Sequence, residues 1–483
     1  RIQNDGNFLF LKLFDLLDKQ KEIDEKELLK TLKLKNRSQF SNTKRHLYSQ
    51  IISSLRMLHK EKRANFKVRE YIDFAYILYG KGLYIQALKL LAKANILAKK
   101  HHLVYMQLTI IEFKKTIESR HITRSGINKA ETLIEESKLI QNGAAHLVTL
   151  SNLRMRMHAK YLEHGHVRNK KEAQEIKQYY HKHIDPINIE DLGMMATIYY
   201  LQSRVWYNYI LLDFDSCSKY AQQWIALLDN NPTIIERDVD LYMRGFHYLL
   251  TTAYHTRKKK VHADYLEKFE AFRKNIYGKL NHNSQILSFL YVHTGRLDNI
   301  ILNGAFQIAE DTINRSILRI KRYRYKLDDH RILVFYYKFA WIYFGNGNTS
   351  KAIFYINKII NNKLKQLRED LQNYTRTLQM MCHYDLGNID ILKYIINNYS
   401  NYSESNKNLN NFLKNATNLF MELRSKGQMD HKDIFKNYLE VFYKLKKEPY
   451  EKRAFVYLDI TSWIESKIKG ISLMEVIANA SEK

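Results

Sequence analysis

The sequence contains few of the residues that make turns. Among 483 residues there are only 3 prolines and 16 glycines, far below ordinary usage. Sheets and long loops need such residues where the chain reverses, so a fold built of many strands is excluded. The shortage favours long helices joined by short polar links.

Cysteines and long apolar runs are equally scarce. Cys217 and Cys382 are too few for a disulfide framework or a cysteine-based metal site, and their apolar surroundings predict small buried residues. No run of 18 uncharged apolar residues occurs, and the richest stretch, 332–344, is interrupted by Lys338. We therefore expect no transmembrane segment and a reducing, cytoplasmic location.

Catalytic motifs are absent as well. The sequence has no phosphate-binding loop, no GxSxG or HExxH motif and no zinc-spaced cysteines. Two His-x-His pairs occur, His164 with His166 and His181 with His183, but the helix predicted over 169–180 would hold them about 20 Å apart. Two ligands are too few for a metal site. We expect no enzymatic activity, metal, cofactor or small-molecule substrate.

The charge is strongly of one sign. The chain has 78 Lys and Arg against 50 Asp and Glu, a net charge of +28. Such an excess favours an anionic partner, which could be nucleic acid, an anionic membrane surface or an acidic protein. A composition rich in Lys, Asn, Ile and Tyr, typical of AT-rich genomes, would also produce it without any binding role.

A small or apolar residue recurs about every 43 positions, each time near the start of an amphipathic helical pattern. These anchors are Ala87, Ala130, Ala173, Cys217, Ala263, Ile300, Ala352 and Leu392. A period of this size indicates stacked helical hairpins, each of which is too small to bury its apolar face alone.

Two of these units carry a recognisable motif. In the first, Tyr71, Phe74, Ala75 and Leu78 precede Gly82-Leu83-Tyr84 and Ala87, Leu91 and Ala94. The second contains Tyr336, Phe339, Ala340, Tyr343, Gly347, Ala352, Ile356 and Ile359, and weaker versions surround Gly387 and Gly295. The pattern resembles tetratricopeptide repeats over roughly residues 68–400, although the period is about 43 instead of 34 residues.

This resemblance implies an all-α fold, a right-handed α-solenoid of about eight TPR-like helical hairpins with helical N- and C-terminal caps. We expect an N-terminal cap over 1–65, a repeat array over 66–400 and a C-terminal cap over 401–483. Helices are predicted at 8–17, 23–32 and 40–59, and again at 412–423, 434–445 and 455–467, after a polar link over 398–415. The first three also fit a helix-turn-helix in which Ser38, Gln39, Ser41, Asn42, Lys44 and Arg45 begin a recognition helix.

The repeat register also predicts a binding groove. In the family, certain first-helix positions face the concave side, and aromatic residues at such positions suit an interface. Carried onto this chain, these positions are Tyr76, Tyr79, Tyr199, Trp206, Tyr209, Tyr337, Trp341, Phe344, Tyr374 and Tyr384. The alternative is that these aromatic residues only pack between helices.

Two basic tracts are candidates for contact with an anionic partner. Arg257, Lys258, Lys259 and Lys260 form a compact run, and Arg315, Arg319, Arg322 and Lys326 are spaced to share one helical face. The leading hypothesis is a non-catalytic protein-interaction scaffold or adaptor that binds a partner protein segment through a basic, aromatic-lined surface. A nucleic-acid-associated regulator and a structural subunit of a larger assembly are the alternatives.

Overall fold

The computed structural model describes residues 8–19, 24–34, 36–60, 63–121, 127–361, 369–405, 411–425 and 431–480. Within these residues the secondary structure is helical throughout and contains no strand. The chain is therefore all-α, as the shortage of turn-forming residues predicted. It divides into two compact units, Arg1–Ala144 and Ala145–Lys483, and the expected boundaries at residues 65 and 400 stay predictions.

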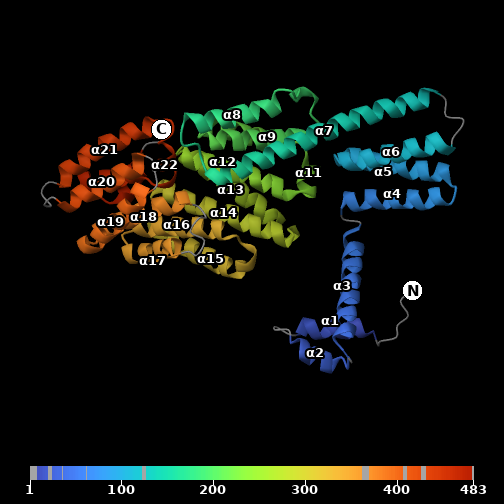
Figure 1. The fold of residues 1–483 in the computed structure, drawn as a ribbon, viewed down its shortest axis with the longest axis horizontal. Coiled ribbons are helices and arrows are strands. Elements are labelled where there is room, and N and C mark those ends of the chain that lie inside the picture. The colour runs from blue at the N-terminus through green and yellow to red at the C-terminus, as the bar shows by residue number, and fades with distance from the viewer. Residues whose placement is uncertain are drawn as a thin grey trace. The chain divides into compact units, whose positions relative to one another are not determined.

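Unit 1 begins with three helices that share a small buried cluster and continues with a hairpin array (Figure 1). Its helices are α1 (Leu9–Lys19), α2 (Glu25–Thr31), α3 (Arg37–Lys60), α4 (Ala64–Gly80), α5 (Tyr84–Lys100), α6 (Val104–His121) and the first part of α7 (Ile127–His164). The three helices expected before residue 60 are thus present, although Ile23 lies outside the described residues. Asp24 caps α2 by accepting a hydrogen bond from the backbone of Lys26 at 2.8 Å.

Unit 2 contains the rest of α7 and seventeen further α-helices within the described residues. These are α8 (Lys170–Ile184), α9 (Met194–Ile210), α10 (Phe214–Asp229), α11 (Pro232–Arg237), α12 (Val239–His255), α13 (Lys259–Ile276), α14 (His282–Asn303), α15 (Ala309–Arg322), α16 (Asp329–Gly345), α17 (Thr349–Ile360), α18 (Glu369–Asp385), α19 (Ile389–Ser405), α20 (Asn411–Ser425), α21 (His431–Lys447), α22 (Arg453–Tyr457), α23 (Ile460–Lys469) and α24 (Leu473–Asn479). The predicted polar link over 398–415 is partly helical, because α19 continues to Ser405 and α20 begins at Asn411.

One turn geometry joins the two helices of five hairpins. The residue before the N-cap of the second helix has a positive φ in the turns α4–α5, α9–α10, α12–α13, α16–α17 and α18–α19. Glycine occupies this position three times, as Gly82, Gly347 and Gly387, because it adopts the left-handed region without strain. Leu212 and Arg257 occupy it in the other two turns, with φ of 62° and 56°.

The recurring anchor is the fourth residue of the second helix. Its backbone N–H donates to the N-cap carbonyl, as Ala87 does to Leu83 at 3.0 Å and Ala352 does to Asn348 at 3.1 Å. In α13 this position belongs to His262, which is fully buried, and the predicted anchor Ala263 is exposed. The buried face of α13 therefore begins one residue earlier than the sequence suggested.

A second correction concerns Ile300, which lies near the end of α14 and opens no helix. The 3-10 turn Phe306–Ile308 and Ala309 begin the next helical segment instead. Gly295, expected in a turn, lies inside α14, where an added Cβ would be 3.0 Å from Leu250 and 3.1 Å from Leu266. Its role is close helix packing, and the turn glycine of this hairpin is Gly304, with φ of 64°.

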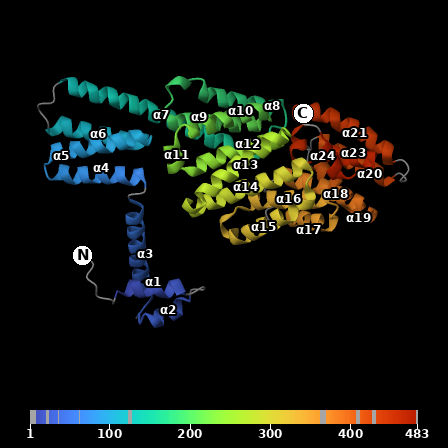
Figure 2. The ribbon, with the colours of Figure 1, turned by 180° about the vertical axis from the view of Figure 1, so that it is seen from behind.

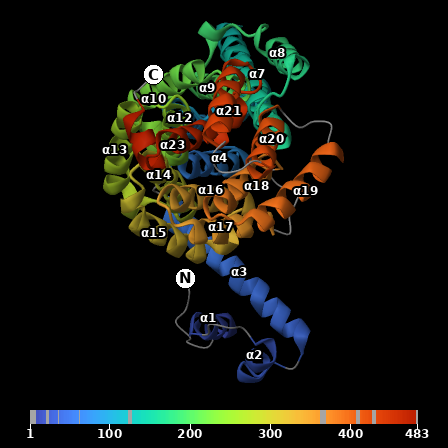
Figure 3. The same cartoon turned by 90° about the vertical axis from the view of Figure 1, so that its left-hand side faces the viewer.

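In unit 2 the helices form a curved double layer. The first helices of the hairpins, α12, α14, α16 and α18, lie on the inner side of the curve, and α13, α15, α17 and α19 lie on the outer side (Figure 3). Successive inner helices contact one another, α12 with α14, α14 with α16, and α16 with α18. The inner side chains of several hairpins are thereby brought together on one concave face.

The C-terminal helices α20, α21, α23 and α24 pack together at one end of unit 2 (Figure 2). The single helix predicted over 455–467 is two helices, α22 and α23, because Leu458 is extended and Asp459 caps the second helix. The short helix α22 contacts α18, and α24 contacts α14. These contacts fix the C-terminal segment beside the concave face.

Candidate binding cavity

The concave side of unit 2 contains a cavity of about 330 Å³. Side chains from α7, α9, α12, α14, α16, α18 and α22 line it, so helices that are far apart in sequence contribute to one site. On each of the three central helices, four of the lining residues recur every three or four positions. They are Arg244, His247, Thr251 and His255 on α12, Tyr291, Thr294, Asp298 and Ile301 on α14, and Arg331, Val334, Lys338 and Trp341 on α16.

The chain's own C-terminal segment forms one wall of the cavity. Val456 and Tyr457 of α22 are among the lining residues. The Tyr337 hydroxyl donates a hydrogen bond to the backbone carbonyl of Tyr457 at 2.9 Å, and the Tyr374 ring stacks on the Tyr457 ring with centroids 4.9 Å apart. The concave face is therefore partly covered by the protein itself.

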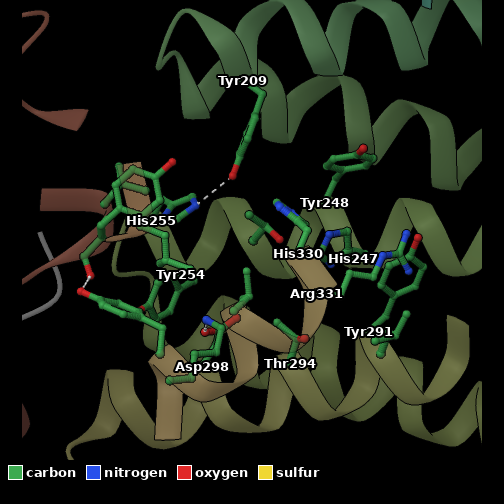
Figure 4. Close-up of a pocket in the computed structure, with 18 of the residues that line it drawn as sticks. Tyr209, His247, Tyr248, Tyr254, His255, Tyr291, Thr294, Asp298, His330 and Arg331 are labelled. Atoms are coloured by element: carbon green, nitrogen blue, oxygen red, sulfur yellow. Dashed lines mark hydrogen bonds and ion pairs between the residues drawn. The ribbon is translucent and has the colours of Figure 1, made fainter. Parts of the chain in front are cut away.

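The two ends of the cavity differ in charge. Figure 4 shows His247, Tyr248, Tyr291, His330 and Arg331 toward one end, and Tyr209, Tyr254, His255 and Asp298 toward the other. At the second end Lys338 forms a buried ion pair with Asp298, whose carboxylate is the only one among the described lining residues. Burial raises the pKa of Asp298, and the charge of Lys338 opposes this rise.

The first end of the cavity is cationic and rich in histidine. The His247 ring stacks on Tyr291, with centroids 4.4 Å apart and planes 12° apart. Burial, followed by the charges of Arg331 and Arg244, lowers the pKa of His247 to about 3. Burial also lowers the pKa of His158, and Arg244 adds to this effect. Burial and, to a smaller extent, the surrounding positive charge thus favour the neutral form of both imidazoles.

Another histidine joins the aromatic wall at the opposite end. His255 Nε2 lies 3.4 Å from the Tyr209 hydroxyl, and its Nδ1 is buried without a hydrogen-bond partner in the described structure. Burial lowers the pKa of His255 far below its ordinary value.

Four of the predicted groove residues line this cavity. Trp206 and Tyr209 come from α9, and Tyr337 and Trp341 come from α16. The repeat register therefore brings the α9 and α16 aromatic residues together, although they are more than a hundred residues apart.

Four other predicted groove residues of unit 2 lie elsewhere. The Arg154 guanidinium stacks over Tyr199 at 4.7 Å, and Phe344 is only 5% exposed within the helix layer. Tyr374 packs on Tyr457, as described above, and the Tyr384 hydroxyl lies 2.8 Å from His431 Nδ1. Tyr374 and Tyr384 thus contact the C-terminal segment.

The predicted groove pair in unit 1 packs against α6. The Tyr76 ring stacks on Phe113 with centroids 4.0 Å apart, although Tyr76 is 52% exposed. The Tyr79 hydroxyl lies 3.0 Å from His121 Nε2. These two residues belong to an aromatic cluster separate from the cavity of unit 2.

In the first basic tract, Arg257 and Lys258 have acidic partners within the chain. Arg257 is ion-paired with Asp459 at the start of α23, and Lys258 Nζ lies 3.0 Å from Asp215. These contacts reduce the charge available to an external anion.

The other two residues of the tract differ in environment. Lys259 Nζ donates to the carbonyls of Ile477 and Ala478 at 3.0 and 3.1 Å, where a cation stabilises the C-terminal end of α24. Lys260 is exposed at the start of α13. An anionic partner for this tract stays a prediction.

The second basic tract is interrupted. Arg315, Arg319 and Arg322 lie on α15, which ends at Arg322, and Lys326 follows in a separate 3-10 turn. The continuous helical face expected from the spacing therefore stops before Lys326. Arg315 Nε is also bound to Asp311 at 2.9 Å.

The remaining histidine candidates have structural contacts. His166 Nδ1 lies 2.8 Å from the Tyr209 carbonyl, His181 Nδ1 lies 3.0 Å from Asp185, and His183 Nδ1 lies 2.8 Å from the Tyr179 carbonyl. The side chain of His164 lies outside the described residues. No group of three metal-ligating side chains occurs in the described part of the chain.

In the predicted helix-turn-helix, α3 begins at Arg37 and contains all six candidate recognition residues. Lys44 Nζ is bound to Glu25 of α2 at 2.6 Å. DNA reading by this helix stays a prediction.

Sequence reasoning missed the polar face of α12. Arg244, His247 and Thr251 lie there, in a segment with little of the repeat motif. Their helical spacing within an otherwise apolar stretch was the available signal, because polar residues on an inner helix face require partners or a ligand.

No family model matches this chain, and comparison with the curated proteins and with the solved structures gives no match either. Among the described helices, none is both long and apolar enough to cross a membrane.

Proposed function

We propose that this protein is a non-catalytic interaction protein that binds a segment of a partner protein in the cavity of unit 2. In this proposal the helices form a right-handed α-solenoid of about eight TPR-like hairpins, and the cavity is the closed part of its concave groove. The lining of the cavity by Trp206, Tyr209, Tyr337 and Trp341 carries the proposal.

The size and chemistry of the cavity suit a short peptide segment. Its volume of about 330 Å³ falls within the range of ligand pockets and provides space for a few side chains. Aromatic rings supply a large contact area at a low cost in side-chain entropy, and their polar ends can hydrogen-bond a peptide backbone. A cavity formed by rigid helices is also largely organised before binding.

The hairpin geometry supports the scaffold part of the proposal. Five turns share the same left-handed residue before the second helix, and the fourth residue of each following helix is buried. Repeated units of this kind stack to form extended concave surfaces. The inner layer of α12, α14, α16 and α18 is such a surface (Figure 3).

A cavity-filling substitution tests the proposal directly. Thr294 lines the cavity and is partly exposed, so Thr294→Phe should occupy the space without leaving a hole in the helix layer. Native co-purification from lysate should recover a stoichiometric protein with the unmodified chain and lose it with Thr294→Phe. The matched control is Thr109→Phe, the same change on an exposed face of α6, which should retain the partner.

Tryptophan fluorescence locates the binding site independently. Of the four tryptophans, Trp206 and Trp341 line the cavity, whereas Trp224 and Trp463 are buried elsewhere. Addition of the recovered partner should change the emission, and Trp206→Phe should remove much of this change while Trp224→Phe leaves it. The proposal is overturned if Thr294→Phe retains the partner and Trp206→Phe still shows the emission change, because binding would then lie outside the cavity.

A further inference from the structure

Arg244 is a partly buried cation at the histidine-rich end of the cavity. It extends from α12 and lines the cavity together with His247 and Arg331. No carboxylate among the described residues lies within ion-pairing distance of its guanidinium. Its side-chain hydrogen bond is with Tyr291, a neutral group on α14, and the carboxylate of Asp238 acts on it electrostatically without a direct ion pair.

The other two cations of the cavity have carboxylate partners. Lys338 is paired with Asp298, and Arg331 Nε lies 3.1 Å from Asp328. Arg154 adds to the positive charge near Arg244, since its contacts are the Gln202 side chain at 3.0 Å and the ring of Tyr199. Among the described residues, neither Arg154 nor Arg244 has a direct carboxylate partner, and Asp238 acts on both only at longer range.

The lining side chains around Arg244 supply no direct anionic partner. Burial lowers the pKa of His158 and His247, and the Trp206, Tyr248 and Tyr291 side chains provide ring faces and hydroxyl groups. A partly buried guanidinium without an anion loses solvation without a compensating ion pair. An anion that enters from outside would supply the missing partner.

We propose that Arg244 binds a carboxylate of the partner segment, so that the cavity recognises an acidic residue flanked by apolar or aromatic residues. This inference rests on the proposed function and specifies its ligand. A carboxylate matches the planar guanidinium and can accept two parallel hydrogen bonds from it. The flanking side chains would pack on Trp206 and the other rings of the cavity.

The test uses two pools of blocked tripeptides with randomised first and third residues. The central residue is glutamate in one pool and glutamine in the other, so the pools differ in charge and hardly in shape. Binding to the full chain is measured by competition against a labelled member of the glutamate pool and by Trp206-dependent fluorescence. We expect the glutamate pool to bind about 10- to 100-fold more tightly, the usual value of a charge-assisted hydrogen bond.

Arginine variants show whether Arg244 is responsible. Arg244→Gln should remove the preference for glutamate while leaving the weak binding of the glutamine pool, and Arg244→Lys should retain part of the preference. Arg315→Gln, on the outer helix α15, is the matched control and should behave as the unmodified chain. Thermal unfolding of each variant separates loss of recognition from loss of fold.

The outcomes distinguish this inference from the proposed function. Equal binding of both pools by the unmodified chain, or an unchanged preference in Arg244→Gln, would overturn the carboxylate site and leave peptide binding in the cavity standing. If Arg244→Gln does not fold, Arg244→Lys takes its place: a preference equal to that of the unmodified chain, or loss of the preference in Arg331→Gln, would overturn the carboxylate site. If neither pool binds and Thr294→Phe retains the native partner, the proposed function itself fails.

Discussion

The guanidinium of Arg257 is ion-paired with the carboxylate of Asp459, 202 residues further along the chain. Arg257 has a positive φ of 56° at a turn position that is glycine in three other hairpins. Asp459 caps α23 and also accepts a hydrogen bond from the Thr461 hydroxyl at 2.8 Å. The pair thus connects the α12–α13 turn to the segment that covers the cavity, and this contact accounts for an arginine at a strained position.

Neutralising this pair should loosen the C-terminal segment. Asp459→Asn keeps a capping oxygen but removes the charge, so we expect the free energy of unfolding to fall by about 2 kcal/mol, between the values of exposed and buried pairs. Urea denaturation measures the loss, and hydrogen exchange should show faster exchange in α22 and α23. Lys258→Gln, which breaks the exposed pair with Asp215, is the control and should cost under about 1 kcal/mol.

The same pair predicts a pH dependence. Burial raises the pKa of Asp459, but Arg257 and the hydroxyls of Ser462 and Thr461 outweigh this effect and hold it well below its usual range. Its stabilisation is therefore present above the unfolded pKa of about 3.9 and is lost as the pH falls through the lower folded value. Asp459→Asn should flatten the stability curve in that acidic window, and an unchanged curve would contradict the assignment.

The buried pair of Lys338 and Asp298 should behave non-additively. Lys338→Met leaves the carboxylate of Asp298 uncompensated, so the free energy of unfolding should fall by about 3 kcal/mol or more. Adding Asp298→Asn removes the buried charge and should recover part of this loss. Chemical denaturation of the two single variants and the double variant measures the coupling. A double variant as unstable as the sum of the single losses would show that the two side chains do not act as a pair.

Substitution by alanine should affect stability differently at two glycines in equivalent positions. Gly80 and Gly345 both end the first helix of a hairpin, but an added Cβ meets no atom within 4 Å at Gly80 and overlaps the Phe306 ring at Gly345. Phe306 is fully buried, so Gly345→Ala should lower the free energy of unfolding by about 1–3 kcal/mol. Gly80→Ala should leave it nearly unchanged or raise it slightly. Thermal unfolding compares the two, and equal effects would contradict the described packing.

A buried histidine should contribute to acid sensitivity. His293 Nδ1 lies 2.8 Å from the Ser316 hydroxyl, and burial, followed by the charge of Arg296, lowers the pKa of His293 to about 3. The unfolded chain binds this proton near pH 6.5, so stability falls as the pH decreases from about 6.5 toward 3. His293→Asn should weaken this dependence, measured by urea denaturation at several pH values. His181→Asn, at an exposed position, should have little effect.

The sequence was sufficient for the fold class and part of the site because both depend on local patterns. Helical periodicity located α4, α5, α16 and α17, and the repeat register placed Trp206 and Trp341 on the cavity-lining face. The repeat pattern was misleading at Gly295, which lies inside a buried helix where a turn was expected. It was also misleading in α13, where His262 occupies the buried anchor position in place of a small residue.

The C-terminal wall of the cavity could not be predicted from local patterns. Tyr457 contacts Tyr337 across 120 residues, and Asp459 reaches Arg257 from an even greater separation. The local sequence around Tyr457 and Asp459 contains no pattern that predicts contact with Tyr337 or Arg257. For the same reason the sequence suggested that Arg257 contacts an external anion, whereas its carboxylate partner, Asp459, lies within the chain.

The contribution of α22 to the cavity has a consequence for synthesis. Tyr457 is added 120 residues after Tyr337, so on the ribosome the inner faces of α12, α14 and α16 emerge long before their cover does. During this interval the nascent chain exposes an aromatic surface to any chaperone or partner nearby. A ligand that requires the complete wall can be retained only by a chain that has been translated through α22.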